Sequence, residues 1–330
     1  MRDFTLNIYK TLLEKLLNSG FNFVRFDEWA EREGQSAKRQ ELEVKGQKSI
    51  VKSETEDERR ETEEASGTQG PFDSAQGDKT LSAMPYALCV LRHDVDRLPG
   101  NSLATARMEN ELGIKGTYYF RIVPASFDEK IIKEIATLGH EVGYHYEEID
   151  FAWRQINGQW SMFNGQYKKN KNTAIKQSDN DAILDLAYSL FKINLEKLRN
   201  LVPVTTICMH GSPLSKYDNK LIWGKYGYRA LGIIGEPYFD IDWNEFGYLT
   251  DTGRSWKNGD ISIRDRVESK FKFKFKFKST QDIIKNVDRL PDKIMINIHP
   301  QRWTDSGIAW VHELVWQNMK NVVKRKLVNG

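Results

Sequence analysis

The chain has 330 residues, 39% hydrophobic and 12% aromatic, which is enough apolar material for one large or two ordinary globular domains. Its 49 lysines and arginines against 46 aspartates and glutamates leave a formal net charge of +3, so bulk charge gives no reason to expect a nucleic-acid partner. Residues 1–10 lack a secretion-signal pattern, and no later segment has the apolar length of a membrane span. We therefore expect a cytoplasmic protein, with Cys89 and Cys208 as reduced, buried hydrophobic residues.

The N-terminal part predicts a helix, a strand and then an insertion. Leucines recur at helical spacing over residues 5–18, Gly20 ends the helix, and residues 21–26 have the pattern of a strand. Residues 33–80 are rich in charged and polar side chains and cannot bury enough apolar surface to offset their ordering entropy. We predict that residues 1–32 pack on the main domain, that 33–80 are disordered, and that 81–330 form that domain.

Strands and helices alternate beyond the insertion. The predicted strands are at residues 87–93, 116–122, 141–145, 204–209, 229–234, 247–250, 260–264 and 293–298. The predicted helices are at residues 101–112, 127–137, 180–200, 280–287 and 308–326. Such alternation predicts an α/β fold with parallel strands and crossover helices, closed as a barrel or open as a doubly wound sheet, with its site at the C-terminal strand ends.

Residues 270–278 alternate Lys and Phe without interruption. As a strand, this tract would place every Phe on one face and every Lys on the other. A basic aromatic stripe is one way to stack nucleobases, but an edge strand or a repeat expansion is favoured, because the remaining sequence gives no second nucleic-acid signal.

The apolar run of residues 88–91 is followed by His93, Asp94 and Asp96. Side chains alternate along a strand, so the two aspartates would point to the same side; a lone pair of this kind is often only a turn. Here the pattern recurs, because His145, His210 and His299 also stand where predicted strands end. Imidazole nitrogens and carboxylate oxygens gathered at the C-terminal ends of the strands suit a catalytic divalent ion, and zinc is our first choice.

Three segments of the chain together resemble the polysaccharide deacetylase family, also called NodB-homology or carbohydrate esterase family 4 proteins. They are residues 94–96 (Asp-Val-Asp), 117–120 (Thr-Tyr-Tyr-Phe) and 139–145 (Gly-His-Glu-Val-Gly-Tyr-His), within a similarity that covers residues 86–303 apart from the Phe/Lys tract. The resemblance implies a distorted (β/α) barrel of about seven parallel strands that removes N- or O-acetyl groups from glycans. It also implies that Asp94 is the catalytic base, Asp96 and His145 are metal ligands, and His299 is the general acid.

The chain departs from this family pattern at the remaining metal ligand. The family's second metal-binding histidine would fall on Ile149, which leaves Glu147, Glu148, Asp150 or His210 as the third ligand. His210 also begins the His-Gly-Ser-Pro segment that replaces the family's Arg-Pro-Pro motif. It is therefore either the third ligand, which we prefer, or the residue that orients Asp94.

An aspartate that orients the catalytic histidine is expected in a further family motif. Its counterpart here is residues 251–256, which hold Asp251, Arg254 and Trp256, with residues 239–243 as a second candidate. We predict supporting or substrate-binding roles for these three and for His93 and Trp303.

The predicted function is metal-dependent hydrolysis of an acetylated carbohydrate, which a cytoplasmic enzyme would meet as a surface-polysaccharide precursor. The alternative is a non-catalytic carbohydrate-binding or scaffold protein of the same fold, with Trp243, Trp256 and Trp303 as stacking platforms. Ile149 in place of a ligand favours the alternative. The presence of an expected base and acid, Asp94 and His299, opposes it, because a binding protein needs neither.

Overall fold

The computed structural model describes residues 2–35, 87–156, 160–163, 166–169, 180–211, 217–256 and 277–329. Of the described residues, 2–29 and those from 87 onwards belong to one compact unit, and 30–35 belong to a second unit. Most of the predicted insertion, the predicted strand at 260–264 and most of the Phe/Lys tract lie outside the described residues. Among the described residues, no helix is both long and apolar enough to cross a membrane.

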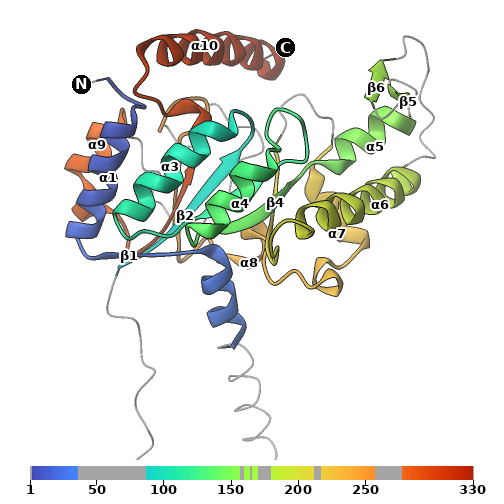
Figure 1. Cartoon of the computed structure of the whole chain (residues 1–330), viewed down its shortest axis with the longest axis horizontal. Coiled ribbons are helices and arrows are strands. Elements are labelled where there is room, and N and C mark those ends of the chain that lie inside the picture. Colours follow the sequence, from blue (N-terminus) through green and yellow to red (C-terminus); the bar gives the residue numbers. More distant parts are fainter. Residues whose placement is uncertain are drawn as a thin grey trace, which may run out of the picture. The chain divides into compact units, whose positions relative to one another are not determined.

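One curled, parallel sheet forms the centre of the larger unit (Figure 1). Its strand order is β7-β4-β3-β2-β9-β8, and β1 also pairs with β2. The sheet is a half-barrel flanked by helices, which confirms the predicted α/β fold of about seven parallel strands. The strands are β1 (Phe21–Val24), β2 (Ala87–Val95), β3 (Thr117–Phe120), β4 (Glu141–Tyr146), β7 (Ile207–Met209), β8 (Gly247–Thr250) and β9 (Lys293–Ile298).

Strand β2 organises the sheet because it is nine residues long and pairs with three neighbours. Strand β9 pairs with residues 88–93, β1 with residues 87–90 and β3 with residues 92–95. A strand has only two edges, so β1 and β3 follow one another along the same edge of β2. The C-terminal half of β2, which holds Asp94, is therefore enclosed on both sides.

Several helices pack apolar side chains against this sheet. Helix α1 buries Ile8, Leu12 and Leu16 in a cluster shared with β2 and β9. A second cluster lies between β3, β4 and β7 and the helices α3, α4 and α6. The main helices are α1 (Leu6–Asn18), α3 (Pro99–Glu111), α4 (Glu129–Thr137), α5 (Glu148–Ile156), α6 (Asn180–Arg199), α9 (Thr280–Lys285) and α10 (Gly307–Asn329).

Two parts of the main unit differ from the sequence prediction. The strand expected at residues 229–234 is a 3-10 turn (Tyr228–Leu231), followed by a single parallel bridge between Thr206 and Gly235. Helix α5 and the antiparallel hairpin of β5 (Trp160–Phe163) and β6 (Gln166–Lys169) were not predicted. Helix α5 begins two residues after the end of β4, so Glu148 and Asp150, two of the candidates for the third ligand, lie in its first turn.

Candidate metal centre

The chemically active side chains gather at the C-terminal ends of five parallel strands. Asp94 ends β2, His145 lies near the end of β4, and His210, Asp251 and His299 directly follow β7, β8 and β9. Parallel strands direct their C-terminal ends to the same edge of a sheet, so residues from position 94 to position 299 meet there. The predicted convergence of polar residues at these strand ends is present in the structure.

Asp96, His145 and His210 form the group best suited to a metal ion. One ligand atom from each lies within 4.8 Å of the others. The Oδ1 atom of Asp96 is 3.4 Å from Nε2 of His210 and 3.7 Å from Nε2 of His145. Buried Oδ1 of Asp96 has no hydrogen-bond partner among the described residues, as expected of an atom prepared for a cation. Two imidazole nitrogens and a carboxylate oxygen could bind a first-row divalent metal.

Neighbouring groups prepare the two imidazoles for ligation. Nδ1 of His145 lies 2.9 Å from the carbonyl oxygen of Cys208, so Nδ1 carries the proton and Nε2 presents its lone pair to the site. Burial lowers the pKa of His145 to about 4, so this imidazole is neutral at pH 7. Nδ1 of His210 lies 3.1 Å from Oε2 of Glu147, within ion-pair distance but without the angle of a hydrogen bond.

The structure also separates the candidates for the third ligand. His210 belongs to the metal-capable group, whereas Glu147 stands behind it and forms an ion pair with Arg121. Glu148 points away, because its carboxylate accepts hydrogen bonds from Tyr144 and from Asn194. Ile149 is fully buried in the core, and Asp150, in the first turn of α5, is in neither metal-capable group of the described residues.

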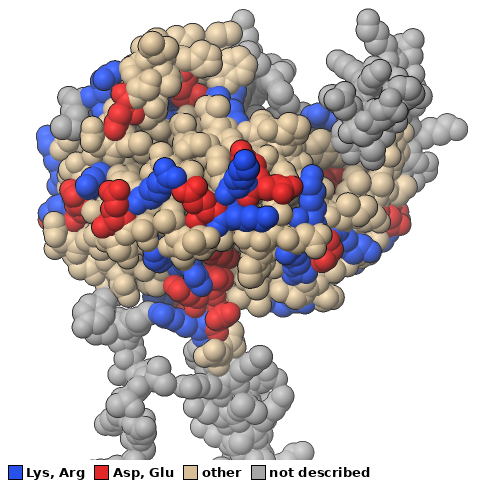
Figure 2. Space-filling view, viewed as in Figure 1, with Lys and Arg blue, Asp and Glu red and all other residues tan. Residues whose placement is uncertain are grey.

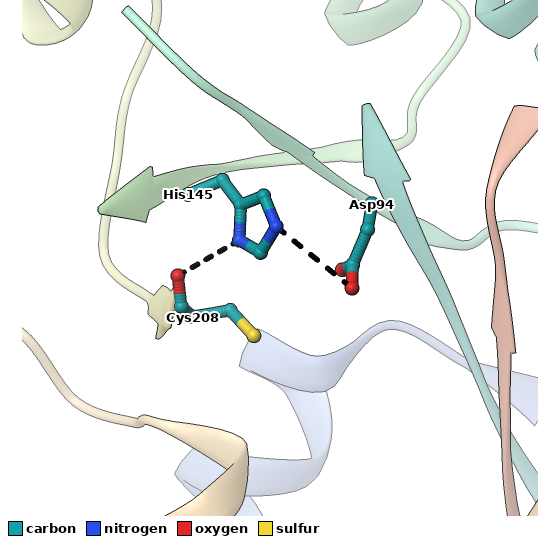
Figure 3. A group of neighbouring side chains, drawn as sticks. All are labelled: Asp94, His145 and Cys208. Atoms are coloured by element: carbon teal, nitrogen blue, oxygen red, sulfur yellow. Dashed lines mark hydrogen bonds and ion pairs between the residues drawn. The ribbon is translucent and has the colours of Figure 1, made fainter. Parts of the chain in front are cut away.

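Asp94, His145 and Cys208 form a second, inner group that could hold a metal (Figure 3). In this group, Oδ2 of Asp94 lies 3.9 Å from Nε2 of His145. However, both Asp94 oxygens already accept hydrogen bonds, two from Arg92 at 2.9 and 2.7 Å and one from Asn297 at 3.0 Å. A metal at the inner group would have to displace these donors, so the outer group with Asp96 is the better metal position.

Asp94 is held ionised by its surroundings. Burial raises the pKa of its carboxyl, but the charge and hydrogen bonds of the Arg92 guanidinium are the largest of the opposing effects, and that pKa lies well below its ordinary value. Arg92 therefore orients Asp94, a role that we had also considered for His210. The sequence contained a usable signal, since positions 92 and 94 lie on the same side of one strand.

His299 is fixed by a buried aspartate on the neighbouring strand end. Its Nδ1 lies 2.6 Å from Oδ1 of Asp251, and its backbone N–H donates to the same carboxylate. Asp251 also accepts hydrogen bonds from Arg302 and from the indole of Trp303, at 2.6 and 2.7 Å. With Nδ1 bound in this way, Nε2 of His299 points towards Asp94 and lies 4.0 Å from its Oδ2. Of the two candidate motifs, residues 251–256 thus supply the orienting aspartate.

Several predicted supporting residues lie elsewhere. His93 points to the opposite side of β2, where its Nε2 lies 2.8 Å from Oε1 of Glu109 and its ring stacks on Tyr118. Arg254 lies over the rings of Phe4 and Trp310 instead of facing the site. Both side chains are thus held by partners outside the candidate metal centre, and the structure does not bring them into it.

The tryptophans expected to stack on sugars are buried. Trp243, Trp256 and Trp303 are 7%, 1% and 0% exposed. The indole of Trp256 donates to Thr280, and that of Trp303 donates to Asp251. Their predicted role as sugar platforms was wrong, since a ring inside the core cannot stack on a ligand; Trp303 instead supports the His299–Asp251 pair.

No protein-family model matches this chain, and no curated protein matches its sequence. What bears on the function of the protein is the geometry of the candidate metal centre, together with the resemblance in the sequence motifs.

Proposed function

We propose that the protein is a metal-dependent hydrolase that removes an acetyl group, bound through nitrogen or oxygen, from a carbohydrate. The observation that carries the proposal is that two groups of side chains lie close together at one edge of the sheet. One is a metal-capable group with an unpartnered carboxylate oxygen, and the other is an acid–base pair in which His299 faces Asp94 at 4.0 Å. The motif resemblance to polysaccharide deacetylases supports the same reaction class.

Asp96, His145 and His210 would hold the ion, for which zinc is our first choice given two imidazoles and one carboxylate. A bound divalent ion would act as a Lewis acid on the acyl carbonyl and favour deprotonation of water. Asp94, ionised and fixed by Arg92, would accept the proton from the attacking water. His299, once protonated, would donate a proton from Nε2 to the leaving nitrogen or oxygen of the sugar.

The non-catalytic alternative has less support. It needed exposed aromatic platforms, and the three tryptophans considered for that role are buried. It also leaves unexplained why a buried carboxylate, Asp251, fixes a histidine against a second ionised carboxylate, Asp94. Such an arrangement costs desolvation of charged groups and is typical of acid–base chemistry.

Acetate release tests the proposal directly. We would incubate the zinc-loaded full chain with N-acetylglucosamine oligomers and, separately, with an O-acetylated oligosaccharide, and measure free acetate. Asp94→Asn is the matched control, because this nearly isosteric change keeps the metal ligands and removes the base. We expect release by the parent chain and at least about a hundredfold less by the variant. Stoichiometric zinc without release from either substrate, or equal release by Asp94→Asn, would contradict the proposal.

A further inference from the structure

Helix α10 is attached to the rest of the molecule through its polar side. Glu313, Gln317 and Asn321, spaced four residues apart, are all buried. Glu313 forms an ion pair with Arg97, and the amide of Asn321 donates to the carbonyl oxygen of Gly253 at 3.0 Å. Arg97 and Gly253 follow Asp96 and Asp251 closely in the chain, so α10 lies at the same end of the sheet as the metal centre.

The opposite side of α10 is apolar and exposed. Val315 is 53% exposed and Met319 is 58% exposed. With Ile308, Val311 and Val322 they follow a spacing of three or four residues, which places all five side chains in one stripe. In Figure 2, the top of the molecule, where Figure 1 places α10, is largely uncharged tan surface. This orientation is the reverse of an ordinary surface helix, whose apolar side faces the core.

The charge of α10 indicates what could cover this stripe. The sequence of the helix contains four cationic residues, Lys320, Lys324, Arg325 and Lys326, all in its C-terminal half. Its one acidic residue, Glu313, is buried and paired with Arg97. A second copy of the helix would therefore offer no exposed carboxylate to these cations, whereas an anionic surface with an apolar interior complements both the charges and the stripe.

Trp316 strengthens the match to a lipid surface. Its ring is 43% exposed beside the stripe, and the ammonium of Lys320 lies 5.3 Å from the ring centroid. Tryptophan is enriched at membrane–water boundaries, where an apolar ring with a polar edge fits the headgroup region.

We propose that α10 is an interfacial helix that docks the protein on anionic phospholipid bilayers. Its apolar stripe would enter the headgroup region, the net positive charge of its sequence would favour an anionic surface, and its polar side would remain on the protein. This docking does not depend on the proposed hydrolase activity, and it would hold the mouth of the metal centre close to the bilayer.

Vesicle co-sedimentation of the full chain tests the docking. We expect binding to mixed phosphatidylserine–phosphatidylcholine vesicles, weaker binding at high salt, and little binding to phosphatidylcholine alone. The double variant Val315→Asp/Met319→Asp should bind at least about tenfold more weakly, because it places charge in the apolar stripe. Val315→Leu/Met319→Leu should bind as the parent does, since the stripe stays apolar.

Ile193→Asp provides a matched surface control. Ile193 is 65% exposed but lies on α6, so this variant should bind like the parent chain. Thermal melts of all variants would show that the fold is retained. Lack of binding by the parent chain, or equal binding by Val315→Asp/Met319→Asp, would overturn the proposal. Light scattering supplies a further test. If the parent chain is a dimer that does not bind vesicles, and the same double variant is a monomer, a second copy covers the stripe and the proposal is overturned.

Discussion

Asp94 and Asp96 are two residues apart, yet their surroundings give them different tasks. Both oxygens of Asp94 accept hydrogen bonds from Arg92 and Asn297, whereas Oδ1 of Asp96 has no hydrogen-bond partner among the described residues and faces two imidazoles. The carboxylate of Asp94 accepts three hydrogen bonds, which leaves one acceptor site, on Oδ1; that is enough for a proton but offers little to a cation. A carboxylate with an unpartnered oxygen beside two imidazole rings can bind a cation.

This division predicts different outcomes for single substitutions. Asp96→Ala and His210→Ala should each weaken zinc binding at least about tenfold, since each removes one of three ligands. Asp94→Asn should keep its zinc. Zinc titration with a competing chelator measures all three affinities.

Cys208→Ala is the matched control for these titrations. Its thiol belongs to the inner group with Asp94 and His145, so the variant should bind zinc like the parent if the ion occupies the outer group. Loss of zinc from Cys208→Ala, together with retention by Asp96→Ala, would move the ion to the inner group.

Arg92 should control the ionisation of Asp94. The variant Arg92→Lys keeps a positive charge but loses the paired contacts to both carboxylate oxygens, at 2.9 and 2.7 Å. Burial, which raises the pKa of Asp94, would then be opposed less strongly, so this pKa should rise. We expect the acid limb of the pH–rate profile to move to higher pH and turnover to fall about tenfold or more, with zinc retained. An unmoved acid limb would argue against Arg92 as the residue that orients the base.

At the scale of single elements, the sequence predicted the strands better than the contacts between their side chains. Runs of apolar residues predicted β2, β4 and β9 and the polar residues at their ends, because the length of an apolar run and the alternation within it can be read from neighbouring residues. The burial of Trp256 was not predictable in this way, since its ring stacks against Phe4, about 250 residues earlier. The role of Arg92 required knowing which side of β2 faces the inside of the half-barrel.

Gly143 shows how closely β3 and β4 approach behind the site. It pairs with Tyr119 in the parallel register, and an added Cβ would clash with Cε1 and Cδ1 of that ring. The ring cannot easily move, because it is fully buried and its hydroxyl lies 3.1 Å from Oγ1 of Thr206. Gly143 therefore fits this position because it lacks a side chain.

Gly143→Ala should destabilise the protein by roughly 1–3 kcal/mol through overpacking and should loosen β4, which carries His145 two residues later. Thermal melting and zinc affinity measure the two effects. Gly224→Ala is the matched control, since no atom lies within 4 Å of the added Cβ there, and its melting temperature should not fall. Equal melting temperatures for Gly143→Ala and the parent would show that the ring adapts.

For the whole molecule, buried carboxyl groups make the free energy of unfolding depend on pH. Burial raises the pKa of Glu148 to about 7, and burial also raises the pKa of Glu236 to about 7 and that of Glu141 to about 8. In the unfolded chain a glutamate titrates near 4.5. Each group therefore contributes its full stability below that value, and the contribution is lost as pH rises through the folded-state pKa.

Glu148 is the clearest case, because hydrogen-bond donors from Asn194 and the backbone oppose burial but no charged partner does. Glu148→Gln cannot ionise, so it should lose less stability than the parent chain between about pH 5 and pH 8, by roughly 2.5 kcal/mol. Chemical denaturation at both pH values measures this difference, and Glu111→Gln, at an exposed position, is the control that should behave like the parent.

Because Glu236 and Glu141 still titrate, the Glu148→Gln variant should keep part of the pH dependence. The same loss in Glu148→Gln and in the parent chain would mean that Glu148 ionises freely inside the fold.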